Sequence, residues 1–129
     1  MRYLVDTSIF VAAMARADRE VRRRFNIHGS EIGVSAIVLH ELYFGAFWSE
    51  RVAHNLGEVE KLGFPLVAFD LDDARAAAEI RARLKREGTP IGPYDVLIAG
   101  QALARGLTVV TANIGEYARV EGLRVENWS

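Results

Sequence analysis

The chain has 129 residues, of which 50% are hydrophobic and 26% are charged, and this size and composition are typical of one compact globular domain. Sixteen Lys and Arg against seventeen Asp and Glu give a formal net charge of −1, so no overall positive charge marks a nucleic-acid or membrane-surface protein. The chain has no cysteine, which excludes disulfides, thiolate nucleophiles and Cys-ligated zinc. We therefore expect a single domain over residues 1–129, in which any binding of a polyanion depends on a local patch.

The apolar runs of the sequence are short. None approaches the roughly 20 residues that a membrane-spanning helix needs. The first ten residues, MRYLVDTSIF, carry Asp6 where a signal peptide would need an unbroken apolar core. We expect a cytoplasmic protein that does not bind membranes.

Short apolar and β-branched runs predict strands, and segments with helical periodicity separate them. The predicted strands cover residues 2–6, 32–35, 65–70, 107–112 and 123–127. Helices are predicted from residue 7 onward, with Thr7 or Ser8 as N-cap, and over residues 18–25, 36–46, 49–63, 71–88 and 94–105.

This alternation of strands and helices predicts an α/β fold. Strands that read as nearly continuous apolar runs are typical of parallel sheets covered on both faces. We expect a three-layer sandwich with a central, mostly parallel sheet of four to five strands. In such folds ligands bind at the carboxyl edge of the sheet.

Four acidic side chains follow the predicted strands closely enough to reach that edge. Asp6 ends the first strand, Glu41 lies in the helix after the second, Asp95 begins the helix after a Gly-Pro turn, and Glu116 follows the fourth strand. Singly, each has a structural interpretation. Asp6 can be a helix cap, and an acid in a first helical turn, such as Asp95, gains about 0.3 to 1 kcal/mol from the helix dipole.

A cluster of these acids needs another explanation. Two like charges about 4 Å apart repel by about 4 kcal/mol at an effective dielectric constant near 20. A divalent cation reverses this effect, and Mg²⁺ and Mn²⁺ prefer carboxylate oxygens. The chemistry that suits such a site is metal-assisted phosphodiester hydrolysis.

The motifs that carry these acids resemble those of a known family. The stretches LVDTSIF, HELYFGA and IGPYDVLIAGQALARGLTVVTANIGEYARVEGLRVENW are similar to the successive motifs of PIN-domain ribonucleases, specifically the VapC-type toxins of toxin-antitoxin pairs. The resemblance extends from Tyr3 to Trp128 and is most specific in the last third of the chain. It implies that Asp6, Glu41 and Asp95 bind Mg²⁺ or Mn²⁺.

The resemblance also implies roles for side chains around these acids. Ser8 falls where the family often has a small polar residue that supports the metal or its water. Relatives have either Asp at the position of Asn113, or Asn there with Glu three residues later. We favour Glu116 over Asn113 as the fourth acidic group. Thr111 is expected to orient its loop, since no base is paired with it for nucleophilic attack.

The family is further expected to cleave RNA endonucleolytically, often tRNA or ribosomal RNA. Its usual partner is a small VapB-type antitoxin whose tail blocks the acidic pocket, and the toxin usually forms a homodimer. An alternative is a PIN-fold module that binds RNA or antitoxin without cleavage, which the departure at Asn113 favours. A receiver-like domain is less favoured, because such domains need a late lysine and the last lysine here is Lys85.

Other conspicuous residues have no assigned role at this level. The histidines, His28, His40 and His54, lack metal-binding spacing, and Tyr94 stays unassigned. Residues 43–48, YFGAFW, are interpreted as core or as a hydrophobic groove for a partner, in preference to a base-stacking surface. A basic stretch can be a solvated helix face or an RNA-backbone contact; it comprises Arg16, Arg19, Arg22, Arg23 and Arg24.

Overall fold

The computed structural model describes residues 1–16 and 18–129. Its centre is a five-stranded sheet with the order β3-β2-β1-β4-β5, in which every neighbouring pair is parallel. The strands are β1 (Tyr3–Val5), β2 (Ile32–Ser35), β3 (Leu66–Val67), β4 (Thr108–Val110) and β5 (Val125–Glu126). The predicted α/β sandwich with a parallel sheet is therefore confirmed.

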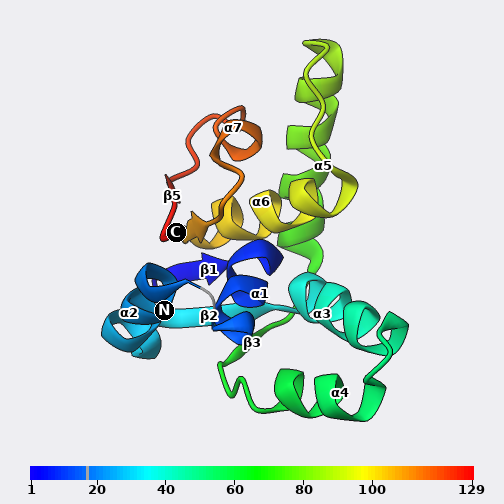
Figure 1. Cartoon of the computed structure of the whole chain (residues 1–129). Coiled ribbons are helices and arrows are strands. Elements are labelled where there is room, and N and C mark those ends of the chain that lie inside the picture. Colours follow the sequence, from blue (N-terminus) through cyan, green and yellow to red (C-terminus); the bar gives the residue numbers. More distant parts are fainter. Residues whose placement is uncertain (17) are drawn as a thin grey trace.

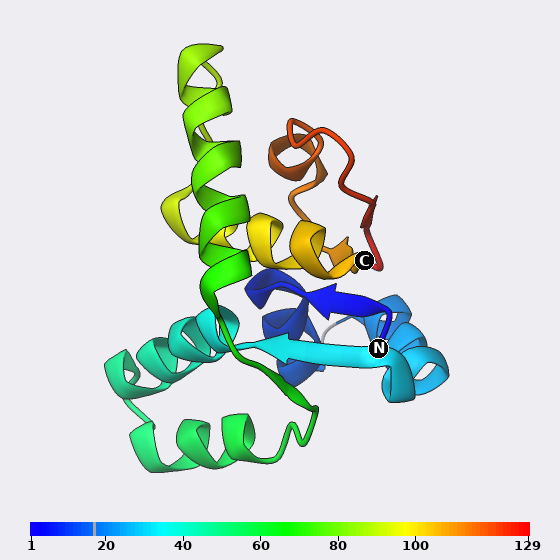
Figure 2. The same ribbon diagram turned by 180° about the vertical axis from the view of Figure 1, so that it is seen from behind.

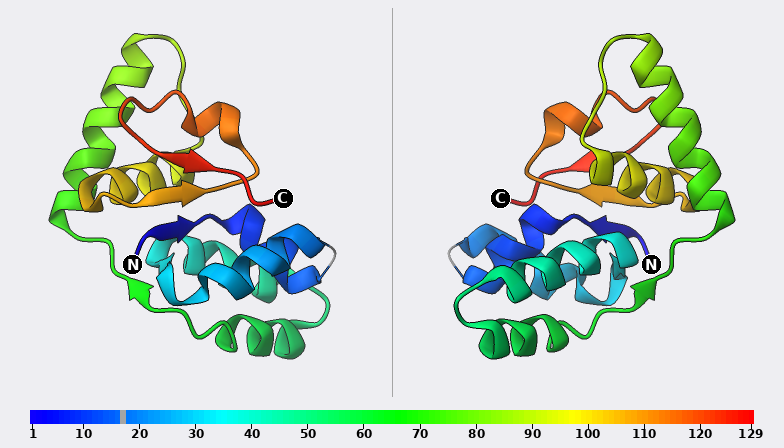
Figure 3. Two further views of the ribbon diagram at one scale, coloured as in Figure 1. Left: turned by 90° about the vertical axis from the view of Figure 1, so that its left-hand side faces the viewer. Right: turned by 90° about the vertical axis from the view of Figure 1, so that its right-hand side faces the viewer.

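Helices lie on both sides of this sheet. In Figure 1 and, from behind, in Figure 2, the strands separate the first four helices from the last three. The helices are α1 (Thr7–Ala15), α2 (Arg19–His28), α3 (Ala36–Trp48), α4 (Val52–Glu60), α5 (Leu71–Arg86), α6 (Pro93–Arg105) and α7 (Ile114–Tyr117), with a 3-10 turn η1 (Gly29–Glu31). Figure 3 shows β1, β4 and β5 side by side between these layers.

The start of α1 differs from the sequence-based expectation. Neither Thr7 nor Ser8 is the N-cap, because both are already within the helix; Asp6 is the cap, and its Oδ1 accepts a hydrogen bond from the backbone N–H of Ile9 at 3.4 Å. An extended aspartate at this position satisfies an otherwise free N–H of the first turn. The residue that ends β1 thus also begins α1.

Several other boundaries differ from the prediction. The third strand has two residues, and α2 continues to His28. Helix α7 was not predicted, because its four residues are too few for a helical period to show in the sequence. The aromatic segment is core only in part: Ala46 is buried and Tyr43 packs against the core. Phe44, Phe47 and Trp48 are 61%, 63% and 82% exposed.

Helix α6 is held against α5 at its centre. A Cβ atom on Gly100 would lie 2.5 Å from the backbone N and Cα of Ala77, so the two helices approach more closely than any larger residue would permit. Both positions are buried. This contact fixes the distance between α6 and α5, and with it the placement of the start of α6 over the sheet.

The second half of α6 is tied to the end of β3. The buried Gln101 donates from Nε2 to the backbone oxygens of Val67 and Ala68 at 3.0 and 3.1 Å. Arg105 forms an ion pair with Asp73 of α5, with Nη2 2.9 Å from Oδ2. The opposite end of α6, which carries Asp95, is thereby directed toward the carboxyl edge of the sheet.

No helix in the described part of the chain is long and apolar enough to cross a lipid bilayer.

Candidate functional site

The carboxyl ends of β1 and β4 place Asp6 beside Thr111. The two strands pair directly, and each of these residues follows the last residue of its strand. Asp6 is 5% exposed, and both of its carboxylate oxygens accept hydrogen bonds from hydroxyl groups: Oδ1 from Ser8 at 2.6 Å and Oδ2 from Thr111 at 2.5 Å. The Asp6 carboxylate is therefore fixed in orientation at the edge of the sheet.

A second carboxylate pair lies at the start of α6. Asp95 is in the first turn of this helix, and its Oδ1 accepts a hydrogen bond from the hydroxyl of Tyr117 at 3.2 Å. Glu116 accepts hydrogen bonds from the backbone N–H of Gly92 at 2.5 Å and from the side-chain amide of Asn113. A Cβ atom on Gly92 would lie 3.1 Å from Asp95 Oδ2 and 3.4 Å from Glu116 Oε1. A larger residue at this position would require these carboxyl oxygens to move by a few tenths of an ångström.

The two carboxyl groups of this pair shift each other's pKa in opposite directions. Burial raises the pKa of Asp95 to about 7, together with the hydrogen bond and the negative charge of Glu116; Asp6 adds a smaller contribution. The same hydrogen bond lowers the pKa of Glu116 against the opposing effect of its burial. Two carboxyl groups in contact cannot both ionise at their ordinary pKa.

Tyr117 lies between these acids and is fully buried. Its pKa is raised by burial and then by the charges of Asp6, Asp95 and Glu41. Its hydroxyl therefore stays protonated and acts as a hydrogen-bond donor to Asp95. The three carboxylates are close enough to act on one side chain, although they come from the junction of β1 with α1, from α3 and from α6.

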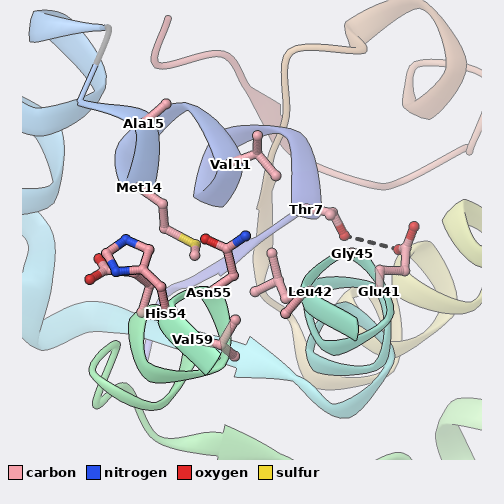
Figure 4. A pocket seen from close by; sticks show the side chains of 12 residues that line it. Thr7, Val11, Met14, Ala15, Glu41, Leu42, Gly45, His54, Asn55 and Val59 are labelled. Carbon is pink, nitrogen blue, oxygen red and sulfur yellow. Dashed lines mark hydrogen bonds between the residues drawn. The ribbon is translucent and has the colours of Figure 1, made fainter. Parts of the chain in front are cut away.

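Glu41 reaches the site from α3. Its Oε1 accepts a hydrogen bond from the hydroxyl of Thr7, the residue after Asp6, at 2.9 Å (Figure 4). The same glutamate borders a cavity of about 340 Å³ between α1, α3 and α4. Apolar side chains form much of the cavity wall, among them Val11, Met14, Leu42 and Val59. Glu41 thus stands between the acidic site and an apolar cavity.

The side chains present suit a divalent cation by their chemistry. Carboxylates are the ligands that Mg²⁺ and Mn²⁺ prefer, and burial together with the charge of Glu116 disfavours the ionised form of Asp95 unless a cation offsets it. As they stand, no three His, Asp or Glu side chains within residues 1–16 and 18–129 are grouped closely enough to bind one ion. Binding of one ion would therefore require these carboxylates to move closer together.

The structure thus places all seven predicted site residues around one edge of the sheet. One hydrogen-bonded group consists of Asp6, Ser8 and Thr111. A second group consists of Asp95, Glu116 and Asn113, in which Glu116 contacts both of the other side chains. Glu41 joins the first group through Thr7. Their roles as catalytic or metal-binding residues stay predictions.

Sequence reasoning missed three contributors to this site. Thr7 was considered only as a cap, Gly92 only as a turn residue, and Tyr117 was not considered. A buried tyrosine next to a candidate acid, in GEY, was the signal available for Tyr117. The contact of Thr7 with Glu41 spans 34 residues, and the local sequence gives no sign of such a contact.

The basic stretch of α2 is engaged elsewhere. Arg23 and Arg24 both form ion pairs with Glu20, with nitrogen to oxygen distances of 2.7 and 3.0 Å. At the end of this helix, the ring of His28 contacts Tyr3 at the start of β1, whereas Asp6 follows the other end of that strand. These contacts favour the interpretation of the stretch as a solvated helix face.

Comparisons with known proteins agree with this architecture. The family model for the PIN domain matches residues 3–123. The tRNA(fMet)-specific endonuclease VapC of Salmonella typhimurium is 40% identical over 130 residues, covering 99% of this chain and 98% of the relative. Ribonuclease VapC2 of Haemophilus influenzae is 36% identical over 130 residues, with the same coverage.

Solved structures give the same result. The chain superposes on DNA-bound VapBC from Salmonella typhimurium with a TM-score of 0.95 and 38% identity, covering 100% of this chain and 99% of the other. For VapBC2 from Rickettsia felis, bound to a DNA fragment from its promoter, the TM-score is 0.93 at 30% identity, with both chains covered completely. From its fold, its acidic edge and these relatives, the chain belongs to the PIN-domain family, as a ribonuclease of the VapC type.

Proposed function

We propose that this ribonuclease is a Mg²⁺- or Mn²⁺-dependent endonuclease that acts in the cytoplasm as the toxin of a type II toxin-antitoxin pair. The observation that carries the proposal is the cluster of Asp6, Asp95 and Glu116 with Glu41 at the carboxyl edge of the sheet. Such a cluster opposes folding unless a cation or proton offsets it. A metal-dependent reaction on an anionic substrate accounts for its presence.

In this proposal each residue has a defined task. Asp6 and Asp95 are direct ligands of the ion. Glu41 is a ligand either directly or through a water molecule, and it also orients the attacking water. A bound Mg²⁺ or Mn²⁺ supplies an activated water and offsets the charge of the scissile phosphate. Ser8 and Thr111 hold the Asp6 carboxylate in one orientation through their hydroxyl groups.

Glu116 is the proposed fourth acidic group, and Asn113 supports it. The Asn113 amide is neutral and adds no charge to the site, but it donates a hydrogen bond to the carboxylate of Glu116. Without a bound ion, the hydrogen bond and charge of Glu116 help to raise the pKa of Asp95, so binding of a cation by Asp95 would release a proton from this pair near neutral pH. No covalent enzyme intermediate is needed for hydrolysis of this kind.

The substrate class we propose is tRNA. Relatives from Salmonella typhimurium and Shigella flexneri, 40% and 39% identical over almost their whole length, are named tRNA(fMet)-specific endonucleases. Residues that choose one RNA over another lie on loops and surfaces, which vary more than the acidic edge. We therefore carry over the class of substrate and leave the individual tRNA to experiment.

The proposed partners are a VapB-type antitoxin and a second copy of this chain. The structural relatives were solved as VapBC complexes. The cavity beside Glu41 offers an antitoxin segment apolar walls next to the acidic site. A basic side chain from such a segment would meet the carboxylate of Glu41 at the cavity rim.

The test compares RNA cleavage by the wild-type chain with that by Asp6→Asn and Glu41→Gln. Each substitution preserves shape and removes one carboxylate, and asparagine retains the capping ability of Asp6. We expect EDTA-sensitive cleavage of bulk tRNA by the wild type with Mn²⁺, and at least a hundredfold loss in each variant at a melting temperature no lower than that of the wild type.

Two outcomes would contradict the proposal. Cleavage that persists in EDTA, or in both variants, would exclude metal-dependent chemistry at these acids. Binding of tRNA by the wild type without any cleavage would instead identify the non-cleaving PIN-fold module. A matched control is Glu79→Gln, an exposed glutamate of α5 outside the site, which is expected to cleave like the wild type.

A further inference from the structure

Two aromatic rings meet beside the acids, and neither has a role in the proposed chemistry. His40 on α3 directly precedes Glu41, and Tyr94 on α6 directly precedes Asp95. Their ring centroids are 5.5 Å apart, with an angle of 45° between the planes. The two rings therefore bridge the two helices that carry these acids.

Both rings are open to solvent. Tyr94 is 45% exposed, and His40 is exposed as well. Among the hydrogen bonds of the described residues, none involves either side chain. Large aromatic side chains that stay exposed and without polar partners are more typical of binding surfaces than of packing.

We propose that His40 and Tyr94 form a platform that stacks against an unpaired nucleobase next to the scissile phosphate. This inference rests on the proposed function, because it concerns how the same site holds RNA. An acidic site repels the RNA backbone, so part of the binding must come from interactions that do not depend on phosphate charge. Stacking on aromatic rings provides such binding and tolerates every base.

The position of the pair fits this task. His40 and Tyr94 are the residues immediately before Glu41 and Asp95, on the two helices that carry these acids to the edge of the sheet. Splayed bases of single-stranded RNA are the usual partners of exposed aromatic side chains. The platform would thus select unpaired over paired segments of a folded RNA and align the backbone with the carboxylates.

Other exposed aromatic rings on α3 provide a matched control. Phe44 and Trp48 stack on each other with centroids 6.4 Å apart, and Trp48 is eight residues beyond His40, about 12 Å along the helix axis. Trp48 has the size and exposure to stack on RNA but is not adjacent to an acid. Its removal separates a specific effect at the site from a general effect of exposed aromatic surface.

The binding experiment uses the Asp6→Asn chain, in which RNA is not consumed, and 12-nucleotide single-stranded RNAs that carry 2-aminopurine at successive positions. We expect quenching of the 2-aminopurine fluorescence at one position, as the base stacks. Tyr94→Ala should abolish this quenching and weaken binding about tenfold. Tyr94→Phe and Trp48→Ala should retain both signals, and His40→Ala should reduce the quenching in part.

The kinetic experiment uses the same substitutions in the otherwise wild-type chain with Mn²⁺. We expect Tyr94→Ala to raise KM about tenfold with a smaller change in kcat, at an unchanged melting temperature and an unchanged affinity for Mn²⁺. A lower melting temperature without a change in quenching would show that the ring contact only fastens α3 to α6 and would overturn the proposal.

Two further outcomes are also decisive. If Tyr94→Ala leaves RNA binding intact but weakens the complex with the antitoxin, the pair is a protein-docking surface and the proposal is wrong. If the wild-type chain neither cuts nor binds any RNA, the proposed function fails along with it. If the wild type cleaves RNA and Tyr94→Ala keeps full activity and full quenching, the stacking proposal is wrong and the proposed function stands.

Discussion

The hydroxyl of Thr111 donates a hydrogen bond to Oδ2 of Asp6 across 2.5 Å, which joins two residues 105 positions apart in the sequence. The same oxygen of Thr111 accepts a hydrogen bond from the backbone N–H of Asn113 at 2.9 Å. Thr111 thus links the carboxylate at the end of β1 to the loop that leads to Glu116. Both the orientation of Asp6 and the path of this loop depend on one buried hydroxyl.

Replacing Thr111 with valine should therefore impair catalysis more than stability. The side chain keeps its shape, but Asp6 and the N–H of Asn113 each lose a partner. Loss of an outer hydrogen bond of this kind typically costs about 10- to 100-fold in metal affinity or activity. The measurements are the initial rate of RNA cleavage and the affinity for Mn²⁺. Thr108→Val, at the other end of β4 and also buried, is the matched control with little expected change. Wild-type rates in Thr111→Val would show that Asp6 does not need this bond.

The pKa of Asp95 predicts how stability depends on pH without a metal ion. The pKa of Asp95 is raised to about 7 in the folded state, whereas it is about 4 in the unfolded chain. Protonation of Asp95 therefore stabilises the fold fully at pH values below about 4. That contribution is lost as the pH rises through 7. In EDTA, we expect the melting temperature to fall between pH 5 and pH 8, and Asp95→Asn should flatten this fall.

A divalent cation should have the opposite pH dependence, because it competes with the proton for the same carboxyl groups. Mn²⁺ is expected to raise the melting temperature clearly at pH 8 and little at pH 5. Thermal shift measurements at both values, with Ca²⁺-free buffers, check this. Equal shifts at the two pH values, or equal shifts in wild type and Asp95→Asn, would contradict the assignment of Asp95 as a ligand.

The ion pair of Asp73 and Arg105 is expected to stabilise the fold. Asp73 is 1% exposed; burial alone would raise its pKa, but the hydrogen bonds from Arg105 and from the backbone of Asp70 outweigh burial and lower it. Arg105→Met leaves this buried carboxylate without its cation, which should cost about 1 to 3 kcal/mol of unfolding free energy in urea at pH 7.

The pH dependence separates this pair from simple packing. Because the pKa of Asp73 is lowered, the stabilisation is present above about pH 4 and is lost as the pH falls through the lowered value. The difference between wild type and Arg105→Met should thus shrink at the lowest pH at which both still fold. Arg83→Met, which breaks an exposed pair with Glu121, is the control and should cost under about 0.5 kcal/mol.

Gly100→Ala tests the close approach of α5 and α6. The added methyl group would lie 2.5 Å from backbone atoms of Ala77, so the helices must separate. We expect a loss of about 1 to 3 kcal/mol of unfolding free energy and, because α6 carries Asp95, a loss of activity as well. Gly57→Ala in α4 has open space around it and should be neutral or stabilising by about 0.5 to 1 kcal/mol. A stable, active Gly100→Ala chain would show that α6 tolerates displacement.

Much of the fold could be predicted because its signals are local. The strand from Ile32 to Ser35 and the helix that begins after Asp70 follow from β-branched runs, acidic first turns and a glycine stop. The parallel sheet follows from the alternation of these elements. Helix α7 could not be predicted, since four residues are too few to show a helical period. The exposure of Phe44 and Trp48 could not be predicted either, because the sequence does not show whether another segment packs over an apolar side chain.

The residues of the candidate site could be predicted from the sequence, but the contacts between them could not. The sequence by itself determined that Asp6, Glu41, Asp95 and Glu116 follow strands or begin helices, and parallel topology sends such residues to one edge. Which carboxylate contacts which partner depended on packing between segments far apart in the chain. Thr111 binds Asp6, Thr7 binds Glu41, and Glu116 raises the pKa of Asp95 only because the sheet order and the contact of α5 with α6 set these distances. Residue types and local periodicity determine what each element is, whereas hydrogen bonds and charge interactions act over a few ångströms, and only the tertiary structure decides which side chains come that close.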